Sequence, residues 1–90
     1  MKLSILTPEK MLFSGEVDSV SLPGAQAPFT VLPNHAPMLS SLQSNGRLSY
    51  LQNNKMETLI MRGGFVEVLN NCITVCTESG AFAHQEETTA

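Results

Sequence analysis

Glycine and proline interrupt this chain at intervals that leave little room for a helix. Between them lie short runs rich in Val, Ile, Leu and Phe, and no window of 11 residues between two breakers shows a 3.6-residue apolar period. Short strands with turn residues at this spacing predict an all-β sandwich or barrel. The interrupting residues are Pro8, Gly15, Pro23-Gly24, Pro28, Pro33, Pro37, Gly46, Gly63-Gly64 and Gly80.

The clearest predicted element is a hairpin formed by residues 65–69 and 72–76. Its turn is Asn70-Asn71, and asparagine tolerates the positive φ that a two-residue hairpin turn requires. Such a turn pairs Val68 with Ile73, Val66 with Val75, Glu67 with Thr74 and Leu69 with Cys72. The side chains of Val66, Val68, Ile73 and Val75 then share one face, which we expect to be the core side.

A second hairpin is predicted from strands at 47–51 and 56–61. Its loop could contain two or four residues, so its register stays open at this point. Earlier strands are expected at 2–6, 11–14, 17–22 and 28–32.

Length and charge exclude several classes of protein. Ninety residues predict one small domain, which we place at residues 1–82, followed by a polar C-terminal tail at 83–90. The net charge is −3 and the five basic residues are scattered, so no nucleic-acid partner is expected. No apolar run approaches the ~20 residues of a membrane span. The stretch before Pro8 is too short for the apolar core of a signal peptide, which favours the cytoplasm.

The two cysteines are expected to be free thiols. Cys72 and Cys76 are four residues apart in one predicted strand, which places their Cα atoms about 13 Å apart. A disulfide requires less than ~7 Å. We expect both thiols to be buried or half-buried.

The most unusual stretch is residues 32–39, where two prolines flank a histidine. Pro33 and Pro37 fix φ at two positions, so the loop around His35 is expected to be stiff. A stiff loop loses little entropy on binding and can serve as a preformed contact surface. An ordinary loop that crosses between the sheets explains the same residues.

Catalytic and metal-binding patterns are not found. His35 lies in no recognisable nucleophile motif, and the two histidines are too far apart in the sequence to indicate a metal site. Residues 24–27 lack the Gly-Lys-Ser/Thr ending of a phosphate loop. We therefore expect no catalytic residue, metal or cofactor. Two rivals stay open: a small hydrolase with His35 as base, and a free-standing β-sandwich module that binds a protein or ligand.

The residues quoted below resemble the epsilon subunit of F-type ATP synthases, the subunit called delta in mitochondria. The combination of Pro-Asn-His-Ala-Pro with a later Gly-Gly-Phe-Val-Glu-Val is specific, and the resemblance covers most of the chain. The matching residues are Thr7-Pro8-Glu9-Lys10, Leu12 to Val17, Leu22-Pro23-Gly24, Phe29, Val31 to Met38, Leu42, Gly46, Gly63 to Val68, Asn71, Val75 and Glu78.

This resemblance implies a two-sheet β-sandwich of about ten short strands. It also implies a non-catalytic subunit of the rotor in the central stalk of a proton- or sodium-driven ATP synthase. The subunit would couple rotation of the c ring to ATP synthesis, at the cytoplasmic face of the bacterial membrane and peripheral to it. By resemblance the surface facing the gamma subunit contains His35, Ala36, Pro37, Met38 and Leu39. By resemblance the contact with the polar loops of the c ring contains Gly24, Ala25, Gln26, Ala27, Pro28 and Phe29.

Two departures from the family pattern are visible. Ala27-Pro28 stands where the family usually has a glycine and often an acidic residue. Typical bacterial members continue into a two-helix C-terminal domain that inhibits ATP hydrolysis, whereas this sequence stops at Ala90. We therefore expect no C-terminal helical hairpin and no inhibition of that kind.

Overall fold

A computed structural model describes residues 1–83, and this part of the chain contains ten strands and no helix. The strands are β1 (Lys2–Leu6), β2 (Met11–Glu16), β3 (Ser19–Leu22), β4 (Phe29–Val31), β5 (Met38–Ser41), β6 (Gly46–Gln52), β7 (Lys55–Met61), β8 (Phe65–Leu69), β9 (Cys72–Cys76) and β10 (Gly80–Phe82). The predicted all-β fold is confirmed. The predicted tail at 83–90 lies outside the described residues except for Ala83.

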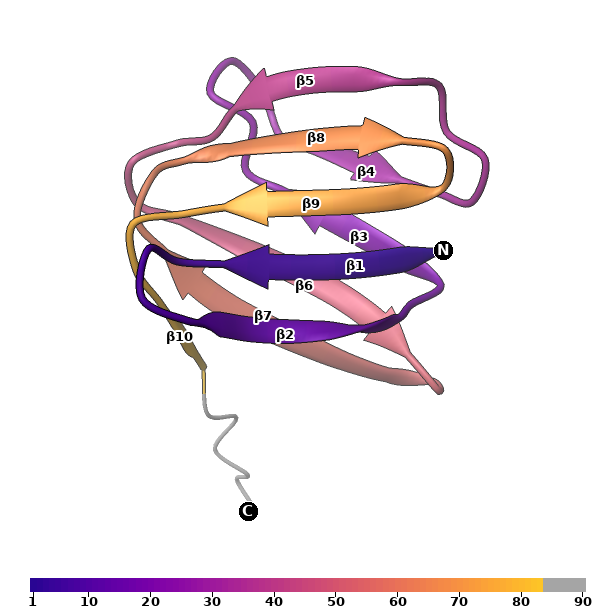
Figure 1. Cartoon of the computed structure of the whole chain (residues 1–90), viewed down its shortest axis with the longest axis horizontal. Coiled ribbons are helices and arrows are strands. Elements are labelled where there is room, and N and C mark those ends of the chain that lie inside the picture. The colour runs from indigo at the N-terminus through magenta and orange to yellow at the C-terminus, as the bar shows by residue number, and fades with distance from the viewer. Residues whose placement is uncertain (84–90) are drawn as a thin grey trace.

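Two five-stranded sheets pack face to face (Figure 1). Sheet A has the order β2-β1-β9-β8-β5, and sheet B has the order β10-β7-β6-β3-β4. Neighbouring strands are antiparallel except for β1 and β9, which run parallel with Leu3 opposite Ile73. This arrangement is the predicted β-sandwich rather than a barrel, because each sheet keeps two open edges.

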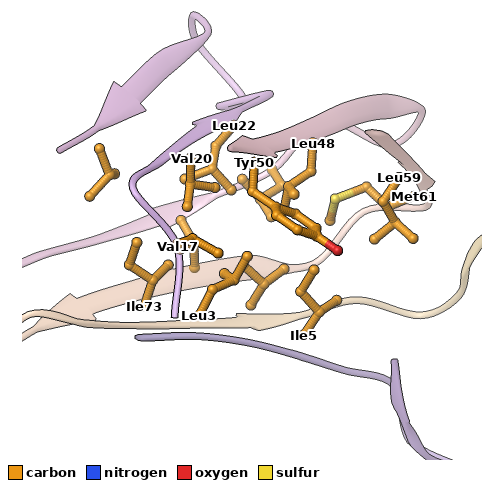
Figure 2. Packing of buried hydrophobic residues seen from close by; sticks show 14 of the residues in the cluster. Leu3, Ile5, Val17, Val20, Leu22, Leu48, Tyr50, Leu59, Met61 and Ile73 are labelled. Carbon is orange, nitrogen blue, oxygen red and sulfur yellow. The ribbon is translucent and has the colours of Figure 1, made fainter. Parts of the chain in front are cut away.

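The core lies between the sheets and is built by alternation along each strand. Side chains on a strand point to opposite faces in turn, so every second residue faces the other sheet. Figure 2 shows these inward side chains converging from both sheets. The buried apolar residues are Leu3, Ile5, Val17, Val20, Leu22, Val31, Leu42, Leu48, Tyr50, Leu59, Met61, Val66, Val68, Ile73 and Val75.

The hairpin of β8 and β9 forms as predicted. Leu69 pairs with Cys72 and Val66 with Val75, and the β-branched face is buried. Asn70 and Asn71 adopt φ values of 50° and 62°, which is the left-handed conformation expected of this turn.

The register of the β6–β7 hairpin, left open by the sequence, is that of a two-residue loop. Gln52 pairs with Lys55, and the turn residues Asn53 and Asn54 both have positive φ. The other early strands form within a few residues of their predicted bounds. The short strands β5 and β10 were not predicted.

The prediction of buried or half-buried thiols is wrong for Cys72, which is exposed, and right for Cys76, which is half-buried. Both cysteines are free, as expected. The physical reason is alternation: with Ile73 and Val75 turned to the core, Cys72 must face solvent on the outer side of sheet A.

Tyr50 gives the fold an expected sensitivity to alkali. Its ring is buried against Phe13, with ring centroids 4.4 Å apart. Burial, with a smaller contribution from the charge of Glu57, raises the pKa of Tyr50 above its usual value. Because the folded state disfavours the phenolate, stability is expected to fall as the pH rises above about 10. Urea denaturation from pH 8 to 11 measures this loss of stability. The loss should be smaller in Tyr50→Phe. If stability falls equally steeply with pH in that variant, Tyr50 is not its cause.

Candidate interaction surface

The loop around His35 is anchored to the β8–β9 turn. The backbone N–H of Asn34 donates to Oδ1 of Asn71 at 2.8 Å, and the N–H of His35 donates to the carbonyl of Leu32 at 3.1 Å. Asn34 itself has a φ of 67°, a left-handed conformation that asparagine adopts more readily than most residues. The loop is therefore held by hydrogen bonds, in addition to the restriction of φ at Pro33 and Pro37.

The imidazole of His35 is oriented by its own loop. Its Nδ1 lies 2.7 Å from the carbonyl oxygen of Ala36. A carbonyl oxygen only accepts, so Nδ1 carries the proton and Nε2 is left for an external group. Within residues 1–83, both hydrogen bonds of His35 go to backbone carbonyls. Among residues 1–83, no hydrogen bond joins this ring to a serine, threonine or cysteine side chain.

The segment 24–29 is fixed at its two ends and exposed in the middle. Gly24 is buried and pairs with Leu42, and its carbonyl accepts a hydrogen bond from Nε2 of Gln43 at 3.1 Å. A Cβ at Gly24 would lie 2.9 Å from Cε1 of Phe29, which is half-buried against the core. Only the residues between them, 25–28, are exposed.

The structure does not bring the two predicted contact segments together. The His35 loop precedes β5 and the segment 24–29 lies beside its far end, where the N–H of Ala25 donates to the carbonyl of Ser41 at 2.9 Å. In Figure 1 the two loops lie at opposite ends of the sandwich. Met38 and Leu39, predicted as part of the His35 surface, belong to strand β5 itself.

A surface without formal charge connects the two segments. Residues 19–46 contain no Asp, Glu, Lys or Arg, and they form β3, β4, β5 and the loops between them. We call this part of the molecule the charge-free flank. It exposes large apolar side chains, with Leu39 70% and Leu32 56% exposed. Depletion of charge together with exposed apolar residues is typical of the centre of a protein–protein interface.

A second feature was not visible in the sequence. At the end of sheet A where β1 and β9 finish, an apolar pocket opens beside Gly64. Its lining combines residues far apart in the sequence: Leu6, Thr7, Pro8, Gly64, Phe65, Cys76, Thr77 and Glu78. Only the parallel pairing of β1 with β9 brings Leu6 beside Cys76.

Residues 1–83 offer neither a metal-binding cluster nor a membrane-spanning helix. No group of three His, Cys, Asp or Glu side chains is placed to hold a metal ion in this range. In the same range the fold offers no helix of the length and apolarity needed to cross a membrane.

Comparison with known families gives a match over all of the described residues. The family described as "ATP synthase, Delta/Epsilon chain, beta-sandwich domain" matches residues 1–83. The ATP synthase epsilon chain of Leptospira interrogans is 43% identical over 81 residues. These residues are 90% of this chain and 63% of that relative, so the chain spans less than two thirds of its length. The ATP synthase epsilon chain of Chlorobaculum tepidum is 42% identical over 76 residues, which are 84% of this chain and 86% of the relative.

Solved structures share the fold at low sequence identity. A chain of the Euglena gracilis mitochondrial ATP synthase, from a structure of OSCP, F1 and c ring, superposes with a TM-score of 0.83 at 18% identity. The match covers 89% of this chain and 51% of that one. A chain from the central stalk and c ring of the Tetrahymena thermophila mitochondrial ATP synthase gives a TM-score of 0.77 at 17% identity, covering 90% and 65%.

Proposed function

Because the chain belongs to the delta/epsilon family of ATP synthase subunits through its β-sandwich domain, we propose that it is a non-catalytic subunit of the central stalk of an F-type ATP synthase. In this role it couples rotation of the c ring, driven by protons or sodium ions, to ATP synthesis. The observation that carries the proposal is the family match over residues 1–83. The subunit would be peripheral to the membrane, on its cytoplasmic face in a bacterium, and needs no cofactor.

The mechanical part of this function requires a body that does not deform under torque. Two sheets with a continuous apolar core meet this requirement, because close-packed interiors have low compressibility. The loops that would make the contacts are also held to the sheets, by Asn71 on one side and by Ser41 and Gln43 on the other. Force applied at either loop is therefore passed directly to the sandwich.

We assign the two contacts to the two ends of the charge-free flank. The gamma subunit would bind His35, Ala36, Pro37, Met38 and Leu39, and the c ring would bind the segment from Gly24 to Phe29. Their separation along β5 supports this assignment, because one rigid domain can then touch two partners at once. Within the second segment the exposed residues 25–28 would touch the c ring, while Gly24 and Phe29 hold the loop in place.

Binding to the gamma subunit tests the proposal. The 90-residue chain is mixed with its cognate gamma subunit and examined by size-exclusion chromatography and calorimetry, with an unrelated β-sandwich protein as control. Co-elution and a saturable heat of binding are expected. A folded chain that shows neither would contradict the stalk assignment and favour a free-standing binding module.

A further inference from the structure

Strand β5 is one of the two edge strands of sheet A. Its hydrogen-bond register with β8 shows which of its backbone groups face outward. The N–H of Leu42 donates to the carbonyl of Gly64 at 2.9 Å, so this pair is a hydrogen-bonded pair of the antiparallel ladder with β8. Bonded and non-bonded pairs alternate along such a ladder. Ser40 and Met38 therefore bond to β8, whereas Leu39 and Ser41 direct their N–H and C=O groups away from it.

This outer edge already accepts a strand partner at one end. The carbonyl of Ser41 receives the N–H of Ala25 at 2.9 Å, the N–H of Gln43 donates to the carbonyl of Pro23 at 2.8 Å, and Gly24 forms an antiparallel bridge with Leu42. The segment 23–25 thus runs as a short extra strand beside residues 41–43. It leaves the edge there, and the N–H and C=O of Leu39 have no strand beside them in the described part of the chain.

The open edge lacks two of the three devices that usually prevent strand addition. Proteins protect exposed edges with charged side chains, prolines or bulges. The opposite edge strand of sheet A, β2, follows Glu9-Lys10, ends at Glu16 and has a bulge against β1. Strand β5 has no charge and no bulge, and it lies inside the charge-free flank. Its neighbouring proline, Pro37, stands before the strand and leaves the N–H of Leu39 in place.

The side chains around the open edge are apolar except for the exposed carboxylate of Glu67. Leu39 is 70% exposed and lies opposite Glu67 of β8, with Phe65 and Leu69 at the two diagonal positions. These two side chains are also exposed, at 49% and 46%. An added strand would find the free N–H and C=O of Leu39. For its alternate side chains it would find a surface that is apolar on either side of Glu67.

We propose that the Leu39 edge of β5 binds an extended, uncharged segment of the gamma subunit as an additional antiparallel strand. This inference rests on the proposed function for its partner, and it changes the nature of the contact from side-chain docking to backbone pairing. The open edge from Pro37 to Ser41 is about 13 Å long, which fits a segment of three or four residues. The bound segment would lie along β5 between residues 23–25 at one end and the His35 loop at the other. Both of these neighbours are already in place in the free chain.

Amide hydrogen exchange distinguishes this proposal from side-chain docking. It is measured by NMR on the isotope-labelled 90-residue chain, alone and saturated with cognate gamma subunit. The amide of Leu39 should exchange rapidly in the free chain and about 100-fold more slowly in the complex, whereas the amide of Ser40 should be protected in both. Bound gamma that leaves the Leu39 amide unprotected would overturn strand addition without affecting the stalk assignment. Absence of gamma binding would instead overturn the stalk assignment. Protection that appears without gamma and rises with chain concentration would make a second copy the occupant and overturn the proposed one.

A pair of variants at one residue gives an independent test. Leu39→Pro removes the outward N–H without breaking a bond to β8, since proline is tolerated on edge strands where the N–H faces solvent. Leu39→Ala removes the side chain and keeps the N–H. If a strand is added, Leu39→Pro should bind gamma at least about tenfold more weakly than Leu39→Ala. Equal affinities of the two folded variants would contradict backbone pairing.

Discussion

Gly64→Ala should destabilise the sandwich by about 3–5 kcal/mol, a large part of the stability of a domain this small. Gly64 has a φ of 111°, a backbone conformation that residues with a Cβ rarely adopt. A Cβ there would overlap the carbonyl oxygen of Cys76 and lie 2.8 Å from Cα of Thr77. Both obstacles are backbone atoms, so neither can rotate away. Chemical denaturation of the 90-residue chain, followed by circular dichroism, measures the loss.

The adjacent glycine provides a matched control. Gly63 also has a positive φ, 59°, but a Cβ there would have no heavy atom within 4 Å. Gly63→Ala should therefore cost only the conformational term, about 1–2 kcal/mol. If the two variants lose the same stability, the overlap with β9 is not what requires glycine at position 64.

The different roles of these two glycines could not be predicted from the sequence. Both glycines predict a bend between two strands, because the neighbouring sequence gives no reason to assign them different roles. The difference arises from the approach of Cys76, which pairs with Phe65 across a hairpin. The turn of that hairpin was predictable, since asparagine at both positions favours it through its own backbone preferences.

The strands that sequence reasoning missed depend on their neighbours. Strand β5 reads Met-Leu-Ser-Ser and β10 reads Gly-Ala-Phe, and neither contains the β-branched residues that indicate a strand. They are strands because β8 and β7 present free backbone groups to them. The parallel pairing of β1 with β9 is a tertiary feature of the same kind, since it joins residues about seventy positions apart.

The candidate surface was predictable in one respect and not in another. The two prolines around His35 predict a stiff loop, and the structure adds a hydrogen bond from Asn34 to Asn71 that the sequence did not indicate. The outward direction of the Leu39 amide could not be predicted, because it depends on the register between β5 and β8.

Among the substitutions considered at position 35, one that adds a negative charge should weaken binding of the gamma subunit most. His35→Glu is expected to weaken the affinity about 100-fold, because it buries a carboxylate in an uncharged contact surface. The glutamate also cannot donate to the carbonyl of Ala36 as Nδ1 of His35 does. The loop should keep its position in the free chain, since the bond from Asn34 to Asn71 does not involve the imidazole. Calorimetric titration with gamma at pH 8 measures the affinity, and thermal unfolding checks the fold.

Two further variants separate charge from other effects. His35→Gln keeps the residue neutral and able to donate through its amide, so its affinity should stay within about tenfold of the original. Ala81→Glu adds the same charge at an exposed position on β10, the far edge of sheet B, and should leave the affinity unchanged. This pattern is required if the charge-free flank is a binding surface, because only there would a carboxylate lose its hydration on binding. If His35→Glu binds as tightly as His35→Gln, the loop stays in water in the complex, and residues 35–37 are not part of the interface.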